Sequence, residues 1–190
     1  MTYGCMSAAQ REALRDVVRG REVIDLGCGD LAMAATMIGL GAARVVAVDK
    51  DPVLVNLAPD KIQVVQGYFA DYDGPVPGVA FLSWPGNWPM PGLLDILARA
   101  EIVVYLGSNT DGSACGWPDL FKALGGRRLI SHVPHRSNTL LIYGSEPGEP
   151  RKLTGEEVAA LHYSGADAGF LTFDNAEYIA ASAELGMRIK

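Results

Sequence analysis

The stretch Val23-Ile24-Asp25-Leu26-Gly27-Cys28-Gly29-Asp30 decides the fold, because an apolar run leads directly into a glycine turn. The run predicts a buried strand over Glu22 to Leu26. The two glycines allow the backbone to turn sharply and to approach a ligand closely. Asp30 is predicted to cap a helix that runs to about Leu40, ends at Gly41 and is buried on most sides. A ligand site is expected here, because ligands of open α/β sheets bind at the carboxyl ends of strands.

Apolar runs and helical stretches alternate along the first two thirds of the chain, as in an α/β sheet. Ser7 with Gln10 forms a capping-box pattern, which predicts an opening helix from Ser7 to Arg19. Further strands are predicted at Arg44 to Asp49, Ile62 to Gln66, Val79 to Ser83, Ile102 to Leu106, Arg128 to Val133 and Thr139 to Tyr143. Short helices are predicted at Val53 to Leu57, Pro91 to Ala100 and Pro118 to Leu124.

The last two predicted strands are joined by a turn too short to cross the sheet, so they should form an antiparallel hairpin. The predicted fold is therefore α/β: a doubly wound, mostly parallel seven-stranded sheet with one reversed strand. We expect a single domain over residues 1–190 with a core at about 7–145. Residues 146–190 are expected to be a C-terminal extension whose structure the pattern does not assign.

The composition is that of a globular protein, with 49% hydrophobic and 20% charged residues, which excludes a largely disordered chain. A net charge of −6 disfavours nucleic acid as the partner. Cys5, Cys28 and Cys115 form no CxxC pair, which fits a reducing cytoplasm. The apolar stretch from Leu31 to Leu40 is too short to cross a bilayer and the N-terminus lacks a signal-peptide core. A cytoplasmic protein without membrane contact is expected.

Carboxylates surround the glycine turn, because Asp25 and Asp30 flank it, so the site favours a cation over an anion. A pyrophosphate would need free N–H groups at a helix N-terminus and a third glycine, where this chain has Ala32. Asp49 follows Gly27 by 22 residues and ends the second predicted strand, where it can accept both hydroxyls of an adenosine ribose. A NAD site and a strand-turn-helix corner without a ligand are the alternatives.

With VIDLGCGD as a glycine-rich motif and VVAVDKD as an acidic strand end, the sequence resembles the class I S-adenosylmethionine-dependent methyltransferases. The resemblance spans roughly residues 21–143 and includes the reversed last strand. It implies S-adenosylmethionine as the cofactor, with Gly27, Cys28 and Gly29 beside the methionine part. Asp25 would support the turn and the methionine ammonium, and Asp49 would hold the ribose. Lys50, next to Asp49, is included among the predicted cofactor-binding residues.

The segment after the third predicted strand, VVQGYFADY, departs from the family pattern. Tyr68 stands where the family commonly carries an Asp that contacts the adenine amino group. Asp71 can serve instead, or Tyr68 and Phe69 can sandwich the ring. The alternative is that both aromatic residues belong to the core and that Asp71 lies in a solvated turn.

The fourth predicted strand ends in VAFLSWPGNWPMPG, where the family places residues that face the methyl group. Amino-group methyltransferases carry a [DNS]PP[YFW] motif there, and the stretch from Ser83 to Trp88 has its components without its spacing. Ser83 and Trp84 are the candidate catalytic residues. Trp84, Asn87 and Trp88 are candidates for a wall that holds a flat or apolar substrate. The alternative is a rigid loop whose tryptophans cover the core.

Methyl transfer mainly requires in-line alignment of the acceptor, and only some acceptors need a general base. The candidate bases are Asp71, Asp111, His132 and His135. The two histidines do not have the spacing of a helical ligand pair, so no metal is predicted. No cysteine has a neighbouring base, so no catalytic thiol is predicted.

The resemblance, together with the absence of an appended recognition motif, leads us to expect a methyltransferase that acts on a small molecule. Methylation of a nucleobase or of a protein amino group is the alternative within enzymes. A non-catalytic module with the same fold is the alternative outside them. The sequence leaves the oligomeric state open.

Overall fold

In the computed structural model, which describes residues 6–53, 60–86, 88–107, 115–135 and 138–147, seven strands form one sheet. The strands are β1 (Glu22–Leu26), β2 (Arg44–Asp49), β3 (Ile62–Gln66), β4 (Val79–Ser83), β5 (Ile102–Gly107), β6 (Arg127–His135) and β7 (Asn138–Pro147). Their order is β3-β2-β1-β4-β5-β7-β6. The first five pair in parallel, whereas β7 is antiparallel to both of its neighbours. The predicted sheet with one reversed strand is confirmed.

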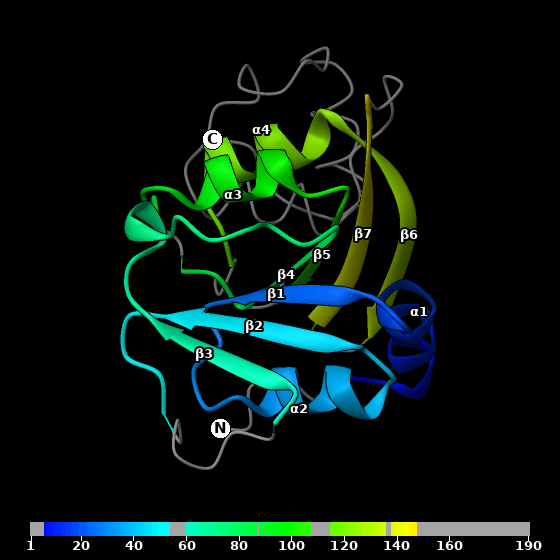
Figure 1. Ribbon diagram of the computed structural model, residues 1–190. Coiled ribbons are helices and arrows are strands. Elements are labelled where there is room, and N and C mark those ends of the chain that lie inside the picture. Colours follow the sequence, from blue (N-terminus) through cyan, green and yellow to red (C-terminus); the bar gives the residue numbers. More distant parts are fainter. Residues whose placement is uncertain (1–5, 54–59, 87, 108–114, 136–137, 148–190) are drawn as a thin grey trace.

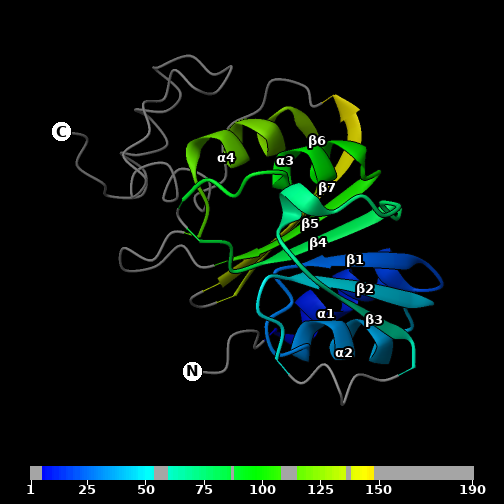
Figure 2. The same ribbon diagram turned by 60° about the vertical axis from the view of Figure 1, so that its left-hand side comes forward.

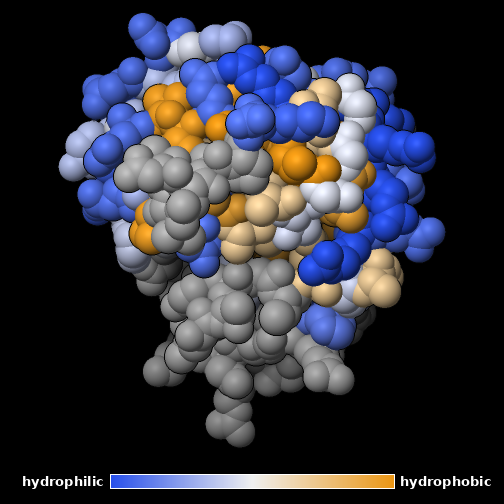
Figure 3. Space-filling model, turned by 60° about the horizontal axis from the view of Figure 1, so that its bottom comes forward, coloured by the Kyte–Doolittle hydropathy of each residue, from blue (hydrophilic) through white to orange (hydrophobic). Residues whose placement is uncertain are grey.

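Helices cover both faces of this sheet (Figures 1 and 2). α1 (Ala8–Val18) and α2 (Ala32–Gly39) lie on one face, and α3 (Leu93–Arg99) and α4 (Pro118–Gly125) lie on the other. Because side chains alternate along a strand, each strand supplies both hydrophobic clusters. The view from the α2 side in Figure 3 shows hydrophobic residues between hydrophilic margins. Within the described ranges, no helix has the length and apolar character needed to cross a membrane.

The predicted bounds of β1 to β4 agree with the structure, and the opening helix has the predicted capping box. The final hairpin is longer than predicted on both strands, and α3 is shorter than the predicted helix from Pro91 to Ala100. The predicted helix from Val53 to Leu57 falls mostly outside the described residues. Nearly all of the C-terminal extension at 146–190 does so too.

The prediction that Asp30 caps α2 is wrong. Leu31 occupies the N-cap position with a left-handed φ of 63°, and the carboxylate of Asp30 instead accepts the N–H of Ala32 over 3.0 Å. The turn needs this extra left-handed residue before the helical geometry can begin. Burial on most sides is also wrong, because Met33 and Met37 face the core while the outer side of α2 is exposed.

A buried glutamine ties α1 to the distant end of the β6–β7 hairpin. The Nε2 of Gln10 donates to the carbonyl of Val133 and to Oδ1 of Asn138, each over 2.9 Å. Its Oε1 accepts the N–H of Ser7 over 3.0 Å. Gln10 is completely buried, so its bonds are made without competition from water. This glutamine therefore holds the start of α1 against the carboxyl end of β6.

Replacing Gln10 by Met should destabilise the protein by roughly 2–4 kcal/mol, because buried partners on the hairpin lose their donors. Chemical denaturation of the wild type and the variant measures this difference. Ser7→Ala is the control, since it removes only the helix cap and should cost about 1 kcal/mol. Equal losses in the two variants would contradict the role assigned to the contacts with the hairpin.

Candidate functional site

The glycine turn after β1 is fastened to the end of β2. Gly27 and Gly29 have left-handed φ values of 81° and 51°. The N–H groups of Gly27 and Cys28 donate to the carbonyl of Val48 over 2.8 Å and 3.3 Å, and that of Gly29 donates to Oδ2 of Asp49 over 2.9 Å. Three successive donors are thus used inside the protein. The turn does not offer them to a pyrophosphate, which argues against the NAD alternative.

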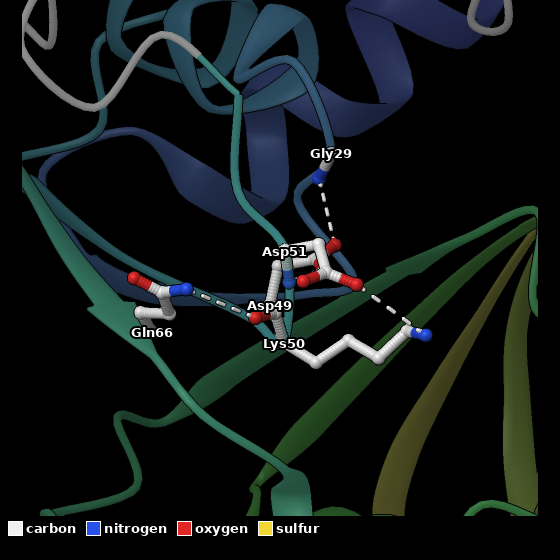
Figure 4. Close-up of polar contacts among 5 residues, drawn as sticks. All are labelled: Gly29, Asp49, Lys50, Asp51 and Gln66. Atoms are coloured by element: carbon white, nitrogen blue, oxygen red, sulfur yellow. Dashed lines mark hydrogen bonds and ion pairs between the residues drawn. The ribbon is translucent and has the colours of Figure 1, made fainter.

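Asp49 joins the turn to the segment that follows β2 (Figure 4). Its Oδ1 accepts the N–H of Asp51 over 2.9 Å, while its Oδ2 accepts that of Gly29. The Nζ of Lys50 lies 3.4 Å from Oδ2 of Asp51, and the Nε2 of Gln66 donates to the carbonyl of Lys50 over 3.3 Å. A carboxylate oxygen can accept more than one hydrogen bond, so Asp49 can still receive two hydroxyls.

The carboxylate of Asp25 lies beside this turn, fully buried, and neither of its oxygens has a hydrogen-bond partner. Burial, together with the nearby charges of Asp49 and Asp30, raises the pKa of Asp25 to about 7. An unpaired buried carboxylate is costly, and a cationic ligand would compensate it. A Cβ built on Gly27 or Gly29 would meet no atom within 4 Å, so a ligand can approach the backbone there. These features fit the cofactor that the resemblance implies.

Cys28 lies within the turn and is 6% exposed. Burial, together with the nearby charges of Asp25 and Asp49, raises the pKa of its thiol to about 12. The thiol therefore stays protonated at neutral pH and cannot act as a thiolate nucleophile.

The three residues predicted to contact the adenine, all in the segment after β3, have different surroundings. Tyr68 is 66% exposed, whereas Phe69 packs against the cluster under α3 and α4. Asp71 ends the short 3-10 helix η2 (Phe69–Asp71) and lines a cavity of about 310 Å³. That cavity lies between residues 71–77 and the sheet, and neither Gly29 nor Asp49 lines it. No described contact joins Asp71 to Asp49.

The residues predicted for the acceptor side follow β4, which pairs with β1. Ser83 is half-buried at the end of the strand. Trp84 has a left-handed φ of 49°, donates its N–H to the carbonyl of Leu106 over 2.7 Å, and packs against the cluster under α3. Trp88 is 62% exposed. Asn87 lies outside the described residues.

Sequence reasoning did not single out Gly92, which lies against the segment after β3. Gly92 precedes α3 with a φ of 83°, and a Cβ built there would lie 2.5 Å from the Cα and N of Ala70. Residues 84–92, which carry the predicted acceptor residues, are named the acceptor loop. Only a glycine allows this loop to approach η2 so closely. Its place directly before the apolar run of α3 was the one available signal. At the other end of α3, Arg127 donates to the carbonyls of Leu97 and Ala100 over 2.6 Å and 3.0 Å.

In the part of the chain that the structure describes, no group of three His, Cys, Asp or Glu residues could hold a metal ion. His132 and His135 lie on β6, while Asp111 is outside the described residues.

Comparisons with known proteins agree with this geometry. A family model described as ribosomal protein L11 methyltransferase matches residues 1–67, which contain the turn after β1 and all of β2. No curated protein matches the chain. A proposed RNA methyltransferase from Pyrococcus horikoshii has a TM-score of 0.55 and 13% identity, over 72% of this chain and 79% of that one.

Two other solved structures are similar in fold. A TehB-like S-adenosylmethionine-dependent methyltransferase from Corynebacterium glutamicum has a TM-score of 0.53 and 17% identity, over 72% of this chain and 88% of that one. The second is a 1,6-didemethyltoxoflavin-N1-methyltransferase from Burkholderia thailandensis with bound 1,6-didemethyltoxoflavin and S-adenosylhomocysteine. It has a TM-score of 0.52 and 16% identity, over 74% of this chain and 79% of that one.

Replacing Asp25 by Asn should stabilise the ligand-free protein at high pH. The folded state binds the proton of Asp25 more tightly than the unfolded state, so this group costs nothing below about pH 4 and lowers stability as the pH rises through about 7. A shift of this size corresponds to about 4 kcal/mol. Denaturation of both proteins from pH 5 to 8 should show a difference that grows with pH. A difference independent of pH would contradict the buried, unpaired carboxylate.

Replacing Gly92 by Ala should separate the acceptor loop from η2 and weaken binding of S-adenosylhomocysteine by roughly tenfold. Gly20→Ala is a matched control, because Gly20 also has a left-handed φ, of 72°, but no atom within 4 Å of its Cβ position. Both variants carry the same backbone strain, about 1–2 kcal/mol. Calorimetric titration measures the affinities. Equal affinities in both variants would exclude η2 from the cofactor site.

Proposed function

We propose that the chain is a class I S-adenosylmethionine-dependent methyltransferase and that it methylates a small molecule that docks beside the loop after β4. The observation that carries this proposal is the exposed Trp88, placed after the strand that pairs with β1 and its glycine turn. An exposed aromatic side chain after a strand that neighbours the cofactor turn is a suitable contact for a compact acceptor.

S-adenosylmethionine supplies a methyl group that its sulfonium already activates, so the protein has mainly to bind and align. Asp49 accepts the two ribose hydroxyls with the lone pairs that its backbone contacts leave free. Asp25 supplies the negative charge opposite the methionine ammonium. The open backbone of Gly27, Cys28 and Gly29 lies along the methionine part.

The adenine side is assigned to the segments after β2 and β3. Lys50 follows Asp49 directly and is oriented by its ion pair with Asp51. Tyr68 offers an exposed ring, and Phe69 anchors the segment in the core. Asp71 remains a proposed contact of the adenine amino group, although its described surroundings are those of the neighbouring cavity.

On the acceptor side, Ser83 ends β4 and faces the reacting methyl in this proposal. Trp84 has a positioning role, because its left-handed backbone redirects the chain while its side chain packs against the core. Asn87 and Trp88 provide the remaining acceptor contacts. The packing of Trp84 supports part of the alternative in which a tryptophan of this loop covers the core.

Methylation of a protein amino group is the second candidate, because the matching family model carries the description of a ribosomal protein methyltransferase. The match ends at residue 67, before β4 begins, so it covers the cofactor side and not the acceptor loop. The small-molecule proposal relies on that loop. The two candidates therefore share the cofactor site and differ only in the acceptor.

Thermal unfolding with S-adenosylmethionine, S-adenosylhomocysteine and NAD tests the cofactor site. A ligand at about 100 times its Kd stabilises by about 2.7 kcal/mol, which is roughly 5–11 °C at this size. Asp49→Asn should lose most of the shift given by the two sulfur compounds, because charge-assisted hydrogen bonds contribute about 1.5–3 kcal/mol each. Asp16→Asn is the control, because Asp16 is exposed on α1, and it should keep the shift. No shift with either compound in the wild type would refute the proposal.

Transfer of tritiated methyl from the cofactor then separates the two acceptor classes. The wild type is incubated with low-molecular-mass and protein fractions of a cell extract, with Asp49→Asn as the inactive control. Label in soluble small molecules supports the proposal. Label that appears only in precipitated protein would establish the second candidate instead.

A further inference from the structure

In the loop after β4, the indole ring of Trp88 lies close to the backbone of Gly86. A Cβ built on Gly86 would lie 2.7 Å from Cζ2 and 2.8 Å from Cε2 and Cη2 of Trp88. The indole therefore lies against Gly86, and any side chain at that position would displace it. Since Trp88 is nevertheless 62% exposed, a large part of the ring remains accessible to a ligand. The contact with Gly86 restricts the positions of the ring before any acceptor binds, which reduces the entropy cost of stacking.

Exposed apolar side chains gather at this edge of the sheet. The large hydrophobic residues that are exposed among the described residues are Val53, Tyr68, Trp88 and Ile130. Val53, Tyr68 and Trp88 follow the carboxyl ends of β2, β3 and β4, whereas Ile130 lies on the edge strand β6. Exposed apolar surface around a cofactor turn points to a ligand with its own apolar faces.

The same edge is negatively charged. The end of β2 and the turns directly after β1 and β2 carry the carboxylates of Asp49, Asp30 and Asp51, and the ammonium of Lys50 is paired with Asp51. The loop from Trp84 to Gly92 contains no charged residue. Phosphate or carboxylate groups on an acceptor would meet repulsion here, while a cation would be attracted both by the carboxylates and by the indole face.

We propose that Trp88 is the stacking platform for the acceptor and that the acceptor is a planar ring system without negative charge. This inference rests on the proposed function. A cationic or uncharged heteroaromatic compound has this chemistry. Stacking supplies the orientation, and the charge of the surrounding turns selects against anionic analogues of the same shape.

Four probes test this with the protein saturated in S-adenosylhomocysteine. N-methylquinolinium, quinoline and quinoline-4-carboxylate share a planar shape and differ in charge, and N,N-dimethylpiperidinium is a cation without a planar ring. Calorimetric titration at low salt should give the tightest binding for the planar cation and at least tenfold weaker binding for the planar anion, a difference that decreases as salt is added. The non-planar cation should bind about tenfold more weakly than the planar one.

Trp88→Ala should reduce the affinity for N-methylquinolinium about tenfold, and Trp88→Phe should restore most of it. Ile130→Ala is the matched control, because it also removes an exposed apolar side chain, 49% exposed, but on β6. Equal binding of the four probes, or unchanged binding by Trp88→Ala, would overturn the inference. Binding of S-adenosylhomocysteine is measured separately, so the loss of that binding would instead refute the proposed function.

Discussion

The charge of Asp25 is the constraint on which the site depends. The carboxylate is buried beside the turn after β1, yet the N–H groups of Gly27, Cys28 and Gly29 are directed to β2. The carboxylate has no hydrogen-bond partner, and burial together with the charges of Asp49 and Asp30 raises its pKa to about 7. A cationic ligand at the open glycine backbone would supply what the protein does not. The protein thus gives up stability at a position where a positively charged cofactor can recover it.

The carboxyl edge of the sheet is held by contacts between segments that are distant in sequence. Asp49 fastens the turn after β1 to the end of β2, and Gly92 brings the acceptor loop against η2. α3 is fixed at its other end by Arg127, and α1 is fixed to the final hairpin by Gln10. These contacts are short and use backbone atoms, so the relative positions of the proposed cofactor and acceptor sides are set by the fold before a ligand binds.

The sheet was predictable from the sequence because buried parallel strands appear as uninterrupted apolar runs between polar flanks. For that reason the bounds of β1, β2, β3 and β4 agree with prediction, and the short final link indicated the reversed strand. The pairing of Asp49 with the glycine turn was also predictable, since both lie at carboxyl ends of neighbouring strands.

Other features of the structure depend on backbone geometry or on partners that are distant in the sequence. Local sequence patterns do not predict such features. The left-handed residues Leu31 and Trp84 are not glycines, so nothing in the sequence marks their conformation. The approach of Gly92 to Ala70 and the bonds of Gln10 to the hairpin arise only when the chain is folded. The missing hydrogen-bond partner of Asp25 likewise becomes visible only once the donors of the turn are assigned.

Proton release on cofactor binding tests the central claim most directly. Titration of S-adenosylmethionine into the wild type and Asp25→Asn at about pH 6.5, in two buffers that differ in ionisation enthalpy, keeps the ligand ammonium largely protonated. The wild type should release a large fraction of one proton, because the cationic ligand lowers the pKa of Asp25, and the variant should release almost none. Equal proton release by the two proteins, or none by either, would contradict the claim that a cationic ligand compensates the buried carboxylate of Asp25.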